Sequence, residues 1–266
     1  MSFDMNNFVI DRVVRGVALS QKDDSVLFSI NQIQNASLNC ASESSDAVDA
    51  LGTPIATFYR AKSAEFSAEN ALYDMNLMAT QLGTTKKVAS AGSKITVPAM
   101  ESFTSAADGK YTLKHTPKAA PTEIYALNDD STFGKKYKKS TGGTAAAETF
   151  AYADGVISLP TGITAGTEMF VMYEYETENA VEVVNSATNF PVGCKFIMEV
   201  LGCDVCDQTN LVYAYVIFNN FKLSPDFDWS IQTDGAHPFS GKAQQDYCDK
   251  EKRLFSIVIP GNDEDE

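Results

Sequence analysis

The feature that most constrains the fold is a series of β-prone segments, of which the strongest is the run LVYAYVIF at residues 211–218. Branched and aromatic side chains favour extended backbone, and short runs of them separated by turn residues are typical of strands. Further segments of this kind occupy residues 8–10, 13–19, 26–33, 55–59, 95–97, 111–115, 123–127, 156–159, 168–175, 196–201, 229–232 and 254–259. The pattern predicts a mainly β protein, and 266 residues are enough to bury a core without disulfides.

One helix is expected, over residues 63–82. Its apolar residues recur three or four positions apart, which places them on one helix face. Ser63 is suited to the N-cap, and Gly83 to the left-handed residue that ends a helix. The stripe is rich in alanine, so we expect this helix to lie close to a sheet or to a neighbouring subunit.

Changes in composition divide the chain into three parts, residues 1–87, 88–179 and 180–266. A linker-like stretch, TTKKVASAGSK, starts at Thr84 and spans the first of these boundaries. The middle part has its own strands, separated by the turn sequences Asp108-Gly109, Asp154-Gly155 and Pro160-Thr161-Gly162, as in a small β-sandwich. We therefore expect one β domain built from the two outer parts and a second β domain inserted into it.

The charge balance and the N-terminus argue against several classes of protein. The chain has 21 basic and 35 acidic residues, a net charge of −14. Because each phosphate contact needs a cation, specific nucleic-acid binding is not expected. No apolar run approaches the roughly 18–20 residues of a membrane span, and MSFDMNNF has no signal-peptide character. We expect a soluble protein synthesised in the cytoplasm.

Few residues are available for catalysis. The two histidines are His115 and His237, and the latter precedes Pro238, which favours a structural turn. The pairs Asp129/Asp130 and Asp226/Asp228 are expected by chance in so acidic a chain. No phosphate-binding, metalloprotease or hydrolase motif is present. The sequence predicts no enzyme and no cofactor.

The five cysteines are expected to be free thiols, because their number is odd and no signal peptide is present. They are Cys40, Cys194, Cys203, Cys206 and Cys248. Cys203 and Cys206 have CxxC spacing, but a zinc site needs two more ligands, and neither a second CxxC nor a histidine pair occurs. Asp204 and Asp207 beside them lack the ligand order of a calcium loop. We interpret this segment as a turn between strands and predict no metal site.

Two polar segments stand out. Residues 40–49 are small and acidic and are expected to form a long loop, a kind of loop that is usually functional or disordered. The run KKYKKSTGG at residues 135–143 is expected to be a basic loop, either in contact with an anionic polymer or simply solvated.

A resemblance to a known family adds to this reading. The segments 216–223, 231–243 and 254–260 resemble the C-terminal half of virion structural proteins of tailed bacteriophages, and residues 24–33 with the alanine-rich segment after Arg60 are similar in style. The whole chain most resembles a major tail or tail tube protein that carries an inserted immunoglobulin-like domain.

The resemblance implies a β-barrel or sandwich with one flanking helix, plus an inserted small β-sandwich domain. Such proteins form rings, usually of six, that stack into a tail tube through which DNA passes without specific binding during ejection. The partners would be further copies of the chain and other tail proteins, and the location would be the virion tail.

The resemblance also suggests roles for particular segments. Strands near residues 26–33 and 211–218 would line the lumen, and the inserted domain would project outward. Ring-to-ring contacts would come from the arm at residues 8–19 and the loop at residues 40–49, represented by Phe8, Val13, Cys40, Glu43, Asp46 and Asp49. Surface contacts of the inserted domain would come from Lys135, Lys136, Tyr137, Lys138 and Lys139, with Tyr173 and Tyr175.

Other functions remain open at this point. A capsid decoration or head–tail joining protein would also be acidic, rich in strands and free of motifs. A carbohydrate- or partner-binding module on a β scaffold is a third reading. An enzyme that uses Cys203, Cys206 or His237 is the weakest, because a nucleophile, a base and an orienting group cannot be assembled from the sequence.

Overall fold

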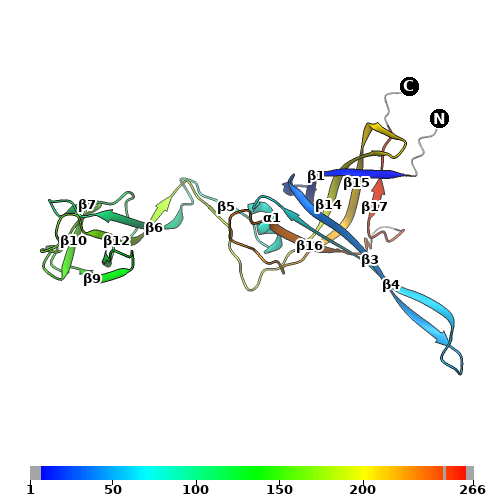
Figure 1. Cartoon of the computed structure of the whole chain (residues 1–266), viewed down its shortest axis with the longest axis horizontal. Helices are drawn as coiled ribbons and strands as arrows, with labels where there is room; N and C mark the ends of the chain where they lie inside the picture. Colours follow the sequence, from blue (N-terminus) through cyan, green and yellow to red (C-terminus); the bar gives the residue numbers. More distant parts are fainter. Residues whose placement is uncertain (1–6, 248–249, 262–266) are drawn as a thin grey trace. The chain divides into compact units, whose positions relative to one another are not determined.

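The computed structural model of the chain describes residues 7–247 and 250–261. The chain divides into two compact units (Figure 1). The first, here called the body, comprises Met1–Lys86 and Val183–Glu266, and the second, here called the insert, comprises Lys87–Glu182. The only helix of the described residues is too short and too polar to cross a membrane.

The body is one antiparallel sheet to which both ends of the chain contribute. Its strand order is β2-β1-β14-β15-β16-β4-β3, and β17 pairs with β15 beside the β15–β16 pairing. The strands are β1 (Phe8–Ser20), β2 (Val26–Ile30), β3 (Ile33–Val48), β4 (Pro54–Asn70), β14 (Gly193–Asp204), β15 (Asp207–Leu223), β16 (His237–Ala243) and β17 (Ser256–Val258).

This sheet curls around a core of phenylalanine rings. Gly16 of β1 lies so close to β3, at the far end of the strand order, that an added Cβ would be 3.0 Å from Ile33 Cδ1. Inside the curl, Phe66 lies 5.6 Å from Phe196 and 5.9 Å from Phe239, measured between ring centroids. The sequence predicts a mainly β fold of barrel or sandwich type with one helix, and the curled sheets and the single helix of the described residues confirm it.

The helix is much shorter than predicted. Helix α1 spans Met75–Gln81, and Asp74 caps it by accepting hydrogen bonds from the backbone N–H groups of Asn76 and Leu77. Residues 63–70 belong to β4, in which every second side chain from residue 64 is buried. The helix prediction was wrong there because residues four apart share a face in a strand as well as in a helix. Gly83 has φ +65° after the helix, as expected.

Three further predictions about the body were wrong. Residues 40–49 are not a loop, because β3 continues to Val48 and pairs with β4. Residues 229–232 form no strand. His237 begins β16 instead of a turn, and its ring is buried.

The insert is connected to the body by two segments that pair with each other, β5 (Lys87–Val88) and β13 (Val181–Glu182). Its sheet has the order β6-β12-β8-β9-β10-β11-β7. The strands are β6 (Ile95–Thr104), β7 (Lys110–Thr112), β8 (Glu123–Leu127), β9 (Phe133–Lys139), β10 (Thr149–Ala153), β11 (Val156–Ser158) and β12 (Glu168–Thr177).

This second sheet also curls, and it encloses a core of its own. Phe103 of β6 and Tyr111 of β7, the two ends of the strand order, stack with ring centroids 3.6 Å apart. Ile124, Phe150 and Met169 are fully buried in this core. The predicted turns at Gly109, Gly155 and Gly162 are present, and all three glycines have positive φ.

Candidate assembly surface

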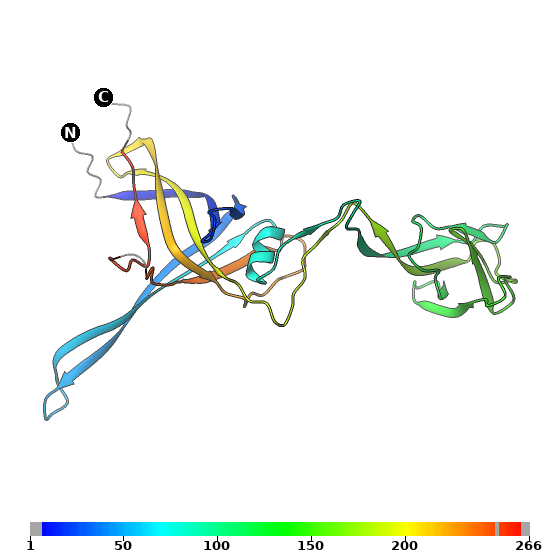
Figure 2. The ribbon, with the colours of Figure 1, turned by 180° about the vertical axis from the view of Figure 1, so that it is seen from behind.

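The most unusual feature of the body is the outer part of the β3–β4 hairpin. The two strands pair from Ile33 and Asn70 at the base to Val48 and Pro54 at the far end. Residues 64–70 alternate between buried and exposed, but every side chain from residue 41 to residue 63 is exposed. Residues 41–61, here called the ribbon, therefore form a two-stranded arm that contributes nothing to the core (Figures 1 and 2).

The ribbon begins at a β-bulge in the β3–β4 pairing. The β3–β4 register shifts between Ala41 and Glu43, and opposite this shift Ala61 has a left-handed backbone with φ +49°. Such a conformation costs a residue with a Cβ about 1–2 kcal/mol. A bulge of this kind bends and twists the strand that carries it, so it sets the direction in which the ribbon leaves the body.

The ribbon exposes large apolar side chains. Leu51 at its turn is 91% exposed and Tyr59 71% exposed. The turn is held by Asp49, whose carboxylate accepts hydrogen bonds from the backbone N–H groups of Leu51 (2.8 Å) and Thr53 (2.9 Å). The exposed apolar residues of the ribbon are Val48, Leu51, Ile55, Phe58 and Tyr59. An isolated hairpin is marginal in water, and such a concentration of apolar surface marks an interaction site.

The residues predicted to contact other copies fall in two different places. Glu43, Asp46 and Asp49 lie on the ribbon, and Cys40 lies exposed at its base, opposite Ala64. Phe8 and Val13 instead lie in β1, paired with Asp204 and Val200 of β14. The Phe8 ring covers Gly202, and Val13 packs against the core. These two are therefore part of the body sheet within the described chain.

The body sheet has open strand edges within the described residues. β2 pairs only with β1. Residues 207–214 of β15 pair only with β14, because β17 begins to pair at Tyr215 and β16 at Phe221. β17 pairs only with β15 within the described residues, so it is an edge strand as well. Exposed apolar residues on these edges are Val26 of β2, Leu211 of β15 and Ile257 of β17. Open edges with apolar side chains are suited to accept a strand from another chain.

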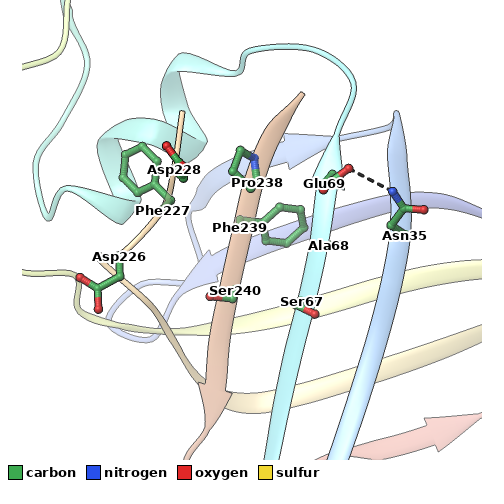
Figure 3. Close-up of a pocket in the computed structure, with 10 residues that line it drawn as sticks. All are labelled: Asn35, Ser67, Ala68, Glu69, Asp226, Phe227, Asp228, Pro238, Phe239 and Ser240. Atoms are coloured by element: carbon green, nitrogen blue, oxygen red, sulfur yellow. Dashed lines mark hydrogen bonds between the residues drawn. The ribbon is translucent and has the colours of Figure 1, made fainter. Parts of the chain in front are cut away.

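A hollow of about 310 Å³ lies where β3, β4 and β16 meet the segment at residues 226–228 (Figure 3). Asn35 Nδ2 donates a hydrogen bond of 3.0 Å to Glu69 Oε2 at its rim. Asp226 and Asp228 lie on the other side, so the hollow is acidic. Among the residues that the structure describes, no group of three His, Cys, Asp or Glu side chains is placed to hold a metal ion.

His237 lies fully buried inside the body. Its Nε2 is 2.8 Å from Gln81 Oε1, and its Nδ1 is buried without a hydrogen-bond partner. Burial lowers the pKa of His237, and the nearby Asp74 carboxylate offsets part of that effect. The Cys203–Cys206 segment forms the turn between β14 and β15, as predicted, with Cys203 buried and Cys206 exposed. Cys248 lies outside the described residues.

The basic segment of the insert is a strand, so the loop prediction was wrong. Residues 135–139 belong to β9, where the pattern KKYKK places Tyr137 in the core and the lysines outside. Lys135 Nζ lies 2.7 Å from Glu148 Oε1, and Lys136 Nζ lies 3.0 Å from Glu123 Oε1. Tyr173 is buried as well, and its hydroxyl donates to the Glu101 carboxylate. Neither tyrosine is available as a surface contact of the insert.

The apolar ribbon was the main feature missed from the sequence. The sequence contains two signals that bear on it, the β-prone run at residues 55–59 and the turn sequence Asp49-Ala50-Leu51-Gly52-Thr53 immediately before it. They are consistent with a turn that leads into the second strand of a hairpin, but residues 40–48 have no strand signal of their own.

The comparisons with known proteins agree with a structural role. A search of curated proteins finds no match. The model of the YomU/Tube protein family matches residues 8–256, nearly the whole described chain and both sides of the insert. This chain thus belongs to the YomU/Tube protein family, and it is a tube-type structural protein of a bacteriophage.

Proposed function

We propose that copies of this chain assemble through the body into rings that stack into a tail tube, through which the genome passes during ejection. The observation that carries the proposal is the ribbon, a paired arm of 41–61 with no buried side chain. Membership of a tube protein family supplies the kind of partner, which is another copy.

Stacking is assigned to the ribbon. Burying one large apolar side chain stabilises an interface by about 1.5–3 kcal/mol before the entropy of association is subtracted. With Val48, Leu51, Ile55, Phe58 and Tyr59 the ribbon offers five such side chains. We assign the partner of the ribbon to a different patch of the next copy, because a contact between two ribbons would close as a two-fold dimer. A head-to-tail contact of this kind repeats without limit and builds a stack.

Ring closure is assigned to the open edges. β2 lies at one end of the strand order, and the free part of β15 with β17 lies elsewhere along it. If β2 of one copy pairs with the open edge at β15 and β17 of its neighbour, the two sheets become one continuous sheet. Repetition of this contact around an axis closes a ring. We expect six copies per ring from the resemblance to tail tube proteins. A net charge of −14 would let DNA slide past such a ring without binding.

The insert is assigned to the outer surface of the tube, as an immunoglobulin-like domain. It has its own core and is attached through the paired strands β5 and β13, so the body can assemble without it. In this assignment residues 1–87 and 180–266 form the tube domain, and residues 88–179 form the decoration.

Two matched deletions test the proposal. In the first, residues 43–60 are replaced by Asn-Gly, which shortens the ribbon and leaves the buried part of β4 intact. In the second, residues 88–181 are replaced by a short Gly/Ser linker. Sedimentation velocity and negative-stain electron microscopy report assembly, and circular dichroism reports folding.

The expected result is tubes from the unmodified chain and from the chain without the insert. The shortened-ribbon protein should be folded and stop at rings or single subunits. Tubes of normal length from the shortened-ribbon protein would refute the role of the ribbon. Unfolding of the protein without the insert would instead show that the two units depend on each other.

A further inference from the structure

The outer face of the insert sheet carries a strip of exposed apolar side chains. Met100 of β6 lies opposite Met172 of β12, and Phe170 of β12 lies opposite Tyr125 of β8. Met100 and Met172 are both exposed, and Phe133 at the start of β9 is 60% exposed. The ring centroid of Phe133 lies 5.0 Å from that of Phe170 and 5.2 Å from that of Tyr125. The strip therefore runs across four neighbouring strands.

A hollow of about 730 Å³ lies at one end of this strip. Its walls come from the β8–β9 turn, from the start of β12 and from β6, with Phe133 and Phe170 among them. The residues that line it are Ser102, Leu127, Asn128, Asp129, Ser131, Phe133, Gly166, Thr167, Glu168 and Phe170. No lysine, arginine or histidine is among them.

The polar groups of the hollow are mainly hydrogen-bond acceptors. Asp129 and Glu168 contribute carboxylates, and Glu168 accepts one hydrogen bond from the Thr104 hydroxyl. The amide nitrogen of Asn128 donates to Thr132 Oγ1 at 3.0 Å, which leaves its oxygen as an acceptor. Two lysines of β9 form ion pairs with residues that do not line the hollow: Lys135 with Glu148, and Lys136 with Glu123.

We propose that this hollow binds an organic ammonium group. A cation is attracted to the negative face of an aromatic ring, and here Phe133 and Phe170 are accessible while two carboxylates supply the opposite charge. The alkyl part of the ligand would cover the exposed rings. An anion would be repelled, and a bare metal ion would find no group of three ligands in the described structure. The site lies within the insert and does not depend on tube assembly.

The test is a titration of the full chain with choline chloride, followed by NMR or calorimetry, with 3,3-dimethylbutan-1-ol as the uncharged compound of the same shape. Choline should bind in the millimolar range and the alcohol at least about three-fold more weakly, because only choline carries the charge. Nα-acetyl-lysine amide, titrated in parallel, distinguishes a protein side chain from a quaternary ammonium compound as the natural source.

Three variants locate the site. Phe133→Leu removes the ring and keeps apolar bulk, and Asp129→Asn removes one charge; each should weaken choline binding at least about three-fold. Asp130→Asn is the matched control, because Asp130 does not line the hollow and its carboxylate accepts from Thr132. Equal binding of choline and the alcohol would overturn the proposal, as would binding of N-acetylglucosamine without binding of either ammonium compound. Equal losses at Asp129 and Asp130 would overturn this location of the site.

Discussion

The insert and the body differ in how completely each sheet closes around its core. Both are curled sheets around an aromatic core, but the insert brings the ends of its strand order together through Phe103 and Tyr111. The body extends a ribbon without a core and leaves β2 and part of β15 unpaired on one side within the described chain. The insert therefore closes around its own core, whereas the body exposes an apolar ribbon and open strand edges that are suited to contact with another chain.

The largest effect is expected from a cavity in the core of the body. Phe66→Ala should cost about 3–5 kcal/mol of unfolding free energy, because Phe66 is buried against Phe196, Phe218, Phe221 and Phe239. Urea unfolding followed by hydrogen exchange would report each unit separately. The body should lose protection at a lower urea concentration, and the insert should be unchanged. Phe150→Ala in the insert is the reciprocal control, and equal losses in both units would contradict two separate cores.

A smaller effect is expected from the buried carboxylate of the insert. Glu101 accepts hydrogen bonds from the hydroxyls of Tyr111 and Tyr173 and from the backbone N–H of Lys114. Burial alone would raise the pKa of Glu101, but these hydrogen bonds outweigh it and hold the pKa below its ordinary value. Burial and the carboxylate raise the pKa of Tyr111 to about 12.

Glu101→Gln should therefore destabilise the insert by about 1–3 kcal/mol. In the unmodified protein this contribution is present above the ordinary pKa of glutamate and is lost as the pH falls through the lowered value. Glu123→Gln, at an exposed ion pair with Lys136, should cost clearly less than Glu101→Gln. Chemical unfolding of the insert measures both changes. A larger loss at Glu123 than at Glu101 would contradict this account of the insert.

The pH dependence should separate the two units. The pKa of His237 is lowered in the folded body, so the unfolded chain binds the proton more readily. The stability of the body should fall as the pH drops below about 6.5, by no more than about 1.4 kcal/mol per pH unit. The histidine of the insert, His115, is exposed, so the stability of the insert should change less than that of the body between pH 7 and pH 5. Thermal unfolding at several pH values tests this, and His237→Gln should flatten the profile of the body. An unchanged profile in that variant would rule out His237 as the cause.

The smallest effect on stability is expected on the ribbon. Phe58→Ser combined with Tyr59→Ser should change the unfolding free energy of the body by less than about 0.5 kcal/mol, because both side chains are exposed. The same variant should reduce assembly in sedimentation experiments. Phe133→Ser, at a similarly exposed site of the insert, is the control that should leave assembly intact. A stability loss without a loss of assembly would show that the ribbon serves the fold of the subunit.

Much of the strand content could be predicted from the sequence, because apolar alternation reports burial on one face. The segment at residues 123–127 is β8 as predicted, and residues 211–218 lie within β15. No side chain of residues 40–49 is buried, so the sequence has no apolar alternation there, and these small and acidic residues are expected to form a loop. Their strand depends on cross-strand pairing with β4, which the local sequence does not reveal.

The helix boundaries and the ion pairs of β9 are two further features that could not be predicted correctly from the sequence. Ala64 and Ala68 fit a helix face and a strand face equally well, and the buried Phe66 between them decides for the strand. The run KKYKK is expected to form a solvated basic loop, because Tyr137 is its one apolar residue and the ion-pair partners Glu148 and Glu123 lie 13 residues away in the sequence.

Electron microscopy of the purified, unmodified chain tests the central claim most directly, namely that the body is completed by other copies. We expect rings and hollow tubes, increasing with protein concentration, because the ribbon and the open edges are then covered. Single subunits of uniform mass at every concentration would contradict the claim, since the exposed apolar ribbon would then have no partner in another copy.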